Sequence, residues 1–457
     1  MNISDARALA LAVQELFETA QHTLRDGSDS PLIQRITTHL GCPLAEVPNV
    51  TLDLPSFEHV NLHRGVEAYL ERHSPDAAWF GIAGHRAFLS VVDMLAEATT
   101  GRGYQLGAVD YATVATGPTT STEAVQLGMV CTSAPDGTPV VLAMQGAQEM
   151  RGEELCHLQL LSADRATAAT VRDEIERLTG EHDAFRGQVL SFGVSEHRHN
   201  QLLTFLPRPS LTASDVVLPE GVLASIERHV IRSATQTEAL RAHRQHLKRG
   251  LLLYGPPGTG KTHTVRYLLS RLPECTVFVL SGVAMFRRLR ATTALARRLA
   301  PSVIVVEDVD LIAQDRSRDT DGNPVLFELL NEMDGIGSEA DVTFVLTTNR
   351  VDLMEDALTQ RPGRVDLAVE VPKPDPDCRE RLLRLYAAGT TLDLPSADRV
   401  VAATEGVTAS FIKELVRRAV LHQVDNGGAL NEAVLHTVLA ELTAEHQTLT
   451  RTILGGR

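Results

Sequence analysis

Cysteine is scarce and unpaired in this chain. The 457 residues contain five cysteines, and no two of them are spaced as a C-x-x-C pair. This pattern argues against a disulfide framework of the secreted type and against a zinc knuckle. Isolated free thiols are typical of a reducing compartment, so the sequence predicts a cytoplasmic protein.

Long apolar runs and an excess of basic charge are also missing. No stretch approaches the roughly 18 apolar residues of a membrane span, and the N-terminus lacks the basic-then-apolar order of a signal peptide. Lys and Arg number 43 against 58 Asp and Glu, which gives a net charge of −15. We therefore expect no membrane span and no nucleic-acid partner, although a local basic lining is compatible with this charge.

What the chain does have is an apolar run that opens into a glycine-rich loop. Residues 251–254 predict a buried parallel strand, and G-P-P-G-T-G-K-T follows directly, before a helical pattern. The glycines allow backbone N–H groups to turn onto phosphate oxygens, and the new helix adds the positive end of its dipole. A Gly/Pro turn without a ligand is the alternative, which the strand–loop–helix context disfavours. The predicted nucleotide-binding residues are Gly255, Pro256, Pro257, Gly258, Thr259, Gly260, Lys261, Thr262 and His263.

Two further apolar strands end in polar residues. Glu307 and Asp308 follow the strand at 302–306, where one acid can hold Mg²⁺ and the other can polarise an attacking water. Asn349 follows the strand at 342–348, and its amide can orient that water against the γ-phosphate. An acidic strand end that is merely solvated is the plainer alternative for the first pair.

Two arginines come next on a stiff turn. Arg361 and Arg364 flank Pro362 and Gly363, which is hard to explain as a solvated charge pair. Guanidinium forks suit the charge that develops during phosphoryl transfer.

The order of these motifs resembles the AAA family of hexameric ATPases. The resemblance covers roughly residues 215–445 and includes the P-loop, the strand with paired acids, T-T-N-R and R-P-G-R-V-D. Gly335 and the lid sequence E-G-V-T-A-S-F-I at 405–412 also match. It implies the cofactors ATP and Mg²⁺ and a ring homo-oligomer, expected to be a hexamer.

The resemblance also assigns roles to the candidate residues. Lys261 and Thr262 bind nucleotide and Mg²⁺, and Glu307 joins Thr262 as a metal ligand. Asp308 is then the presumed base. The remaining catalytic assignments are a sensor at Asn349 and, as fingers that complete a neighbour's site, Arg361 and Arg364.

Three departures distinguish this chain from the family pattern. The usual Asp-Glu pair is reversed to Glu307-Asp308, which is similar to the mitochondrial branch that translocates the folded Rieske iron–sulfur protein, although we expect no membrane anchor here. The shorter base predicts slower catalysis or a shifted water. Residues 281–289 are shortened where unfoldases carry a pore loop, which leaves threading of polypeptide open. Ala409-Ser410 replaces the usual Gly-Ala of the lid helix.

The N-terminal region resembles no family known to us, and its pattern is mixed α/β. We expect an amphipathic helix at 4–25, a short helix at 32–40, a loop at 113–122, and a β-α-β unit over 157–192. The last unit consists of strand 157–161, helix 164–178 and strand 188–192. His197 and His199 share one strand face, but no third metal ligand is evident, and an exposed edge is the alternative.

The predicted fold is α/β throughout. A P-loop module with a parallel sheet flanked by helices carries a small helical lid and follows an N-terminal α/β domain. The expected segments are a helical start (1–45), the α/β adaptor domain (46–206), a linker (207–217), the large ATPase subdomain (218–373), the lid (374–446) and a tail (447–457).

This organisation predicts an ATP-driven machine that remodels, unfolds or disassembles a protein client held by the N-terminal domain. One alternative is a nucleotide-gated scaffold with little turnover. Another is a factor that assembles or disassembles a folded complex without threading. The sequence does not name the client.

Overall fold

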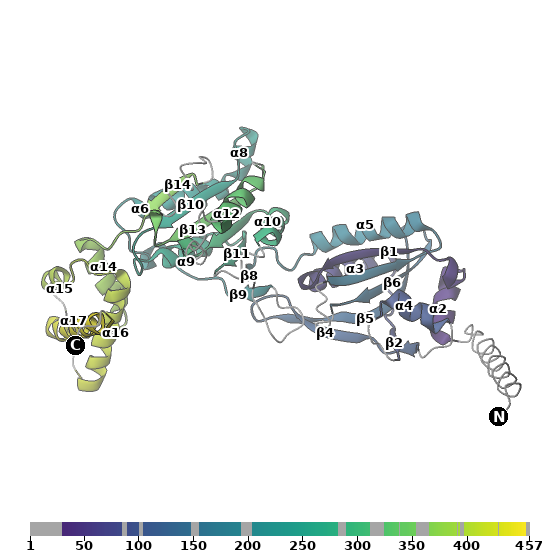
Figure 1. The fold of residues 1–457 in the computed structure, drawn as a ribbon, viewed down its shortest axis with the longest axis horizontal. Coiled ribbons are helices and arrows are strands. Elements are labelled where there is room, and N and C mark those ends of the chain that lie inside the picture. The colour runs from purple at the N-terminus through teal and green to yellow at the C-terminus, as the bar shows by residue number, and fades with distance from the viewer. Residues whose placement is uncertain are drawn as a thin grey trace, which may run out of the picture. The chain divides into compact units, whose positions relative to one another are not determined.

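The computed structural model describes residues 30–84, 89–99, 104–147, 155–192, 203–281, 289–310, 324–337, 339–352, 365–390, 392–393, 397–427 and 429–453. The chain divides into two compact units (Figure 1). The first comprises residues 1–185 and 193–205, and the second comprises residues 186–192 and 206–457. Residues 186–192, which the sequence placed in the N-terminal domain, therefore lie with the second unit.

The first unit is built on an antiparallel sheet in the order β1-β7-β6-β5-β4. Its strands are β1 (Asn49–Pro55), β4 (Asp110–Ala115), β5 (Ser121–Ser133), β6 (Pro139–Gln145) and β7 (Leu155–Leu161). The helices are α2 (Pro31–Leu40), α3 (His59–His73), α4 (Val91–Ala98) and α5 (Arg165–Glu181), and a separate ladder joins β2 (Gly81–Ala83) to β3 (Gln105–Gly107). Short 3₁₀ turns lie at Leu44–Glu46 and Ser56–Glu58.

Helices cover both faces of this sheet, because successive side chains of a strand point to opposite faces. On β6, Val140, Leu142 and Met144 pack with α3 and α5, whereas Val141 and Ala143 pack with α2 and α4. Burial on both faces explains why β6 is an unbroken apolar run in the sequence.

Helices α3 and α5 approach each other closely at Gly65. A Cβ atom there would lie 2.2 Å from Thr179 Oγ1 and 2.9 Å from Thr179 N, which is backbone and cannot swing away. We expect Gly65→Ala to destabilise the unit by about 1–3 kcal/mol, as overpacked cores do. Gly180→Ala is the matched control, since nothing lies within 4 Å of its Cβ position.

The fluorescence of Trp79, the single tryptophan, reports this transition because its ring packs against the same core. Denaturant midpoints should fall for Gly65→Ala and stay equal or rise for Gly180→Ala. Equal midpoints for the wild type and Gly65→Ala would show that the helices can separate without cost.

One sequence prediction for this region is wrong, and a second is right only in part. The β-α-β unit does not form, because β7 pairs antiparallel with β1 and β6, while β8 (Val189–Ser191) pairs parallel with β11 (Thr276–Leu280) of the second unit. The predicted loop at 113–122 is confirmed for residues 116–120 but is shorter than expected, since its β-branched threonines at both ends extend β4 and β5 of a β-hairpin. The helix expected at 32–40 is confirmed as α2, which ends at Gly41 with φ of 72°.

The second unit contains a parallel sheet that runs β14-β10-β13-β12-β11-β8. Its strands, besides β8 and β11, are β10 (Arg249–Tyr254), β12 (Ser302–Val306), β13 (Val342–Thr348) and β14 (Leu367–Glu370). The chain returns to this unit at Leu206, the last residue of β9 (Thr204–Leu206). The helices of this layer are α6 (Val222–Glu227), which continues as a π-turn at Arg228–Arg232, α7 (Ser233–Thr235), α8 (Thr237–Ala242), α9 (Lys261–Arg271), α10 (Leu289–Arg298) and α12 (Pro324–Gly335).

A helical subdomain completes the second unit, as the lid was expected to. It consists of α14 (Pro376–Tyr386), α15 (Asp398–Ala403), α16 (Ala409–Asn426) and α17 (Glu432–Ile453), with a two-residue ladder between β15 (Leu392–Asp393) and β16 (Leu430–Asn431). Val400, Ile412, Leu415 and Leu435 lie at the centre of its own apolar core. The sequence predicted this subdomain from the resemblance of residues 405–412 to a helical lid.

The predicted linker at 207–217 contains no strand or α-helix and has one 3₁₀ turn at Ala213–Asp215, but hydrogen bonds hold it to the second unit. The Arg208 guanidinium donates to four backbone carbonyls, those of Gly187, Leu269, Leu272 and Cys275, at 2.9–3.0 Å. These bonds fasten the stretch to the C-terminal end of α9 and to the segment before β8. A composition signal for a linker cannot detect an arginine that binds backbone carbonyls.

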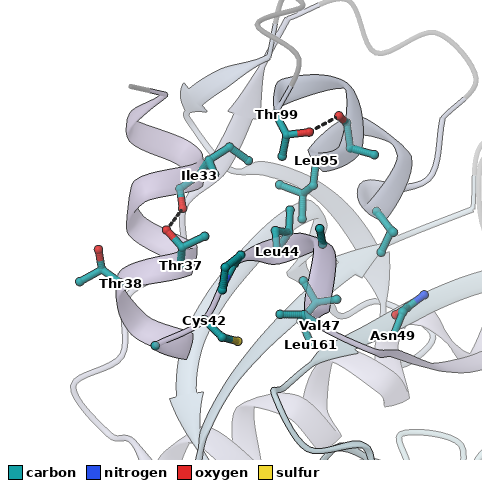
Figure 2. A pocket seen from close by; sticks show the side chains of 15 residues that line it. Ile33, Thr37, Thr38, Cys42, Leu44, Val47, Asn49, Leu95, Thr99 and Leu161 are labelled. Atoms are coloured by element: carbon teal, nitrogen blue, oxygen red, sulfur yellow. Dashed lines mark hydrogen bonds between the residues drawn. The ribbon is translucent and has the colours of Figure 1, made fainter. Parts of the chain in front are cut away.

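An apolar groove of about 820 Å³ lies in the first unit, between α2, α4 and the turn at residues 41–47 (Figure 2). Two of its three threonine hydroxyls bond to nearby backbone carbonyls, Thr37 to that of Ile33 at 2.9 Å and Thr99 to that of Ala96 at 2.6 Å. No Asp, Glu, Lys or Arg lines it among the described residues. The groove therefore suits apolar groups rather than charged ones.

Candidate functional site

The candidate residues converge on one edge of the parallel sheet. The order β10-β13-β12 places three strands side by side, with Tyr254 beside Thr348 and Leu346 beside Val306. Because parallel strands share their carboxyl edge, the segments after β10, β13 and β12 leave the sheet together. These segments are the glycine-rich loop, Asn349 and the Glu307-Asp308 pair.

The loop after β10 needs its glycines. Gly255, Gly258 and Gly260 have φ of 140°, 76° and 113°, which side-chain-bearing residues rarely adopt. A Cβ on Gly255 would lie 2.3 Å from the carbonyl oxygen of Val371. The Thr259 hydroxyl closes the loop by donating to the carbonyl of Pro256 at 2.9 Å. Helix α9 begins at Lys261, so its N-terminus faces the loop as an anion site requires.

Lys261 lies inside this loop with only 6% of its surface exposed. Its Nζ donates to the carbonyls of Gly255 and Pro256 at 2.8 and 2.9 Å, and to Asn349 Oδ1 at 2.8 Å. Burial lowers the pKa of the ammonium, and the charges of Asp308 and Asp310 act in the opposite direction. The strands thus place the predicted lysine and the predicted sensor in direct contact.

The two acids after β12 differ in environment. Burial raises the pKa of Glu307, while a hydrogen bond with Thr262 and the charge of Arg266 oppose that change. Asp308 has φ of 49°, a left-handed conformation that Asp tolerates better than most residues, and its N–H donates to Thr347 Oγ1 at 3.0 Å. A strained backbone at this point is a common feature of functional sites.

Thr262 and Glu307 fit the Mg²⁺ site that the sequence predicted. The Thr262 hydroxyl is near enough to the Glu307 carboxylate to lower its pKa by hydrogen bonding, so two oxygen donors lie near each other at the start of α9. Hard oxygen donors of this kind are what Mg²⁺ prefers.

Asn349 is held from several sides. Its side-chain oxygen accepts from Lys261, so its amide nitrogen faces the acids, with long contacts of 3.4 Å to Asp308 and 3.5 Å to Asp310. Its backbone N–H donates to Asp310 Oδ1 at 2.9 Å. The sequence reasoning missed Asp310, whose only signal was a third acid in the run E-D-V-D.

The lid reaches the P-loop directly. The backbone N–H of Ser410, in the first turn of α16, donates to the carbonyl of Gly258 at 3.0 Å, and a Cβ on Gly258 would lie 2.2 Å from Ser410 Oγ. This contact fixes the first turn of the lid helix against the loop, where Ser410 and Thr408 share a hydrogen bond of 3.0 Å. The ring of His263, which the sequence expects to bind nucleotide, bonds through Nε2 to the carbonyl of Asp215 at 2.8 Å.

Several predicted features fall outside the described residues. They are Arg361 and Arg364, the helix at 4–25, His197 and His199, and most of the segment at 281–289.

Comparison with known proteins agrees with this site. Residues 251–373 match the family described as ATPase family associated with various cellular activities (AAA). The chain is 33% identical over 288 residues to the ATP-dependent zinc metalloprotease FtsH 4 of Sphaerobacter thermophilus, a match that covers 57% of this chain and 43% of that protein. It is 31% identical over 220 residues to the 26S proteasome regulatory subunit 6A of Encephalitozoon cuniculi, covering 45% and 54% of the two chains.

The fold and the family match identify an AAA module in the second unit, and the match to the family model does not include the first unit. The chain spans about half the length of the curated relatives it matches, which also include proteasome-activating nucleotidase 2 of Halobacterium salinarum. No helix in the described part of the chain is long and apolar enough to cross a membrane.

Proposed function

We propose that this chain binds and hydrolyses Mg·ATP and uses the turnover, in a ring homo-oligomer, to remodel a protein client held by the first unit. The observation that carries the proposal is the contact of Lys261 with Asn349 across the sheet edge that also presents Glu307 and Asp308. Mg²⁺ supplies Lewis acidity at the phosphates when bound. The residues that would hold it are Thr262 and Glu307.

The chain's own groups divide the remaining work. Lys261 binds phosphate oxygens, Asp308 accepts the proton of the attacking water, and Asn349 orients that water. The similarity to proteasomal ATPases supports the ring and the protein client. Five free cysteines support a reducing, cytoplasmic location.

Substitutions of Glu307 and Asp308, the reversed acidic pair, test the proposed hydrolysis. We expect Asp308→Asn to retain Mg·ATP and to lose about 10²–10⁴ in turnover, the usual contribution of a general base. Glu307→Gln should in addition weaken the dependence of binding on Mg²⁺. Steady-state turnover and calorimetric titrations with and without Mg²⁺ measure both effects. Normal hydrolysis by Asp308→Asn would transfer the role of base to Glu307.

A nucleotide-gated scaffold is the second candidate, favoured by the shorter carboxylate at the position of the base. The two functions separate on the wild-type chain, because an ATPase ring should turn over faster as it assembles. Tight binding with negligible turnover at every protein concentration would favour the scaffold.

The client can be found with the same variant. A pull-down with Asp308→Asn should trap a client that the wild type releases. Translocation of an unstructured model polypeptide then distinguishes an unfoldase from a remodeller of folded complexes.

A further inference from the structure

We propose that Asp310 is a positioning residue for turnover, because its carboxylate fixes both the backbone and the amide of Asn349 in the orientation that contacts Lys261. The inference rests on the proposed ATP hydrolysis and adds a residue to it. Asp310 is 4% exposed, and its carboxylate is hydrogen-bonded to Thr348 and Asn349, so its role is to act through Asn349.

Three groups of one segment donate to this carboxylate. Oδ1 accepts from Thr348 Oγ1 and from the backbone N–H of Asn349, both at 2.9 Å, and Oδ2 lies 3.5 Å from Asn349 Nδ2. These contacts bind the turn after β13 to the turn after β12. Both oxygens are therefore engaged with residues 348–349.

The orientation of the Asn349 amide follows from this arrangement. Lys261 can only donate, so the oxygen of the amide must face Lys261 and its nitrogen must face acceptors. Asp308 and Asp310 supply those acceptors as carboxylates, which accept and do not donate when ionised. In Asp310→Asn, the new side-chain NH₂ group would face the donors of residues 348–349 and could not accept their hydrogen bonds. The Asn349 side chain would then lose its orientation toward Lys261.

The expected effect falls on turnover rather than on binding. Asp310→Asn keeps the size of the side chain and removes a negative charge near the nucleotide phosphates, so affinity for ATP should stay equal or rise. Misplacing a catalytic group by about 1 Å costs about a hundredfold in rate. We expect Asp310→Asn to lower kcat by about 10- to 100-fold on this basis.

A double-mutant cycle on the full chain tests the mechanism. If Asp310 acts through Asn349, the pair Asp310→Asn with Asn349→Ala should have the kcat of Asn349→Ala alone. A merely structural defect would multiply with the loss of Asn349. Asp352→Asn is the matched control, since this exposed carboxylate near the same turn pairs with the side chain of Arg350, and its kcat should equal that of the wild type.

The outcomes distinguish a failure of the role of Asp310 from a failure of the proposed ATP hydrolysis. A wild-type chain without Mg·ATP turnover overturns the proposed function. An active wild type with unchanged kcat in Asp310→Asn, or with multiplicative losses in the cycle, overturns only the role of Asp310. If Asp310→Asn does not fold, Thr348→Val removes one donor to the same carboxylate at equal volume, and its cycle with Asn349→Ala gives the same readout.

Discussion

Replacing Lys261 by alanine should weaken nucleotide binding severely and abolish turnover. The wild-type ammonium lies in the glycine loop, and the carbonyls and the amide that it contacts hold it in the position from which it can reach phosphate oxygens. Two charge-assisted bonds to phosphate contribute about 3–6 kcal/mol, so affinity should fall by about 10²–10⁴. Calorimetric titration with ATP measures the loss directly.

Lys248 provides the control for this experiment. It stands at the opposite end of β10, and its Nζ donates to the carbonyl of Met333 at 3.1 Å, away from the loop. Lys248→Ala should bind ATP like the wild type. Unchanged affinity in Lys261→Ala would remove this residue from its assigned role, and an equal loss in both variants would indicate a general defect of the fold.

Local sequence patterns predicted the strands and helices of the second unit, because each of them has a recognisable pattern of apolar, polar or glycine residues. The strands at β10, β12 and β13 are continuous apolar runs bounded by polar residues, and the loop after β10 has a fixed glycine spacing. The pairing of β8 with β11 could not be predicted, because three residues carry too little pattern to choose between two sheets. The hairpin of β4 and β5 was missed because threonine is common in both loops and strands.

The residues of the candidate site also fall into two groups, those that motifs in the sequence predicted and those that only the structure revealed. The residues that would touch nucleotide were found from motifs, because phosphate and Mg²⁺ demand particular groups at particular spacings. Asp310 was not, because its role depends on the register between β12 and β13 and not on its neighbours in sequence. His263 was included by its place in the motif, and only the structure places its ring against Asp215.

Loss of Arg361 should leave ATP binding by the isolated subunit nearly intact and lower turnover by about 10³–10⁵, the usual contribution of an arginine finger. This prediction rests on the resemblance of the sequence at 361–366 to the family motif, because Arg361 and Arg364 lie outside the described residues. Asp366 accepts from the backbone N–H of Gly250 at 2.8 Å and donates its own N–H to the carbonyl of Gly250 at 2.9 Å. This anchor lies at the amino end of β10, whereas the P-loop leaves the carboxyl end of the same strand. Arg384→Ala is the matched control, an exposed arginine of α14 that pairs with Glu380.

Mixing two inactive subunits decides whether the site is shared. An Arg361→Ala subunit keeps an intact pocket, and a Lys261→Ala subunit keeps an intact finger, so an interface that joins the two in the right order is complete. In a ring mixed at equal amounts, about a quarter of the interfaces have that order, because heterologous contacts are directional. We therefore expect recovery of about a quarter of the wild-type activity per site, and the same recovery with Arg364→Ala in place of Arg361→Ala. Native mass spectrometry checks that the subunits mix. Mixed rings without activity at any ratio would remove the trans-acting role, and full hydrolysis by a monomer would show that no neighbour is needed.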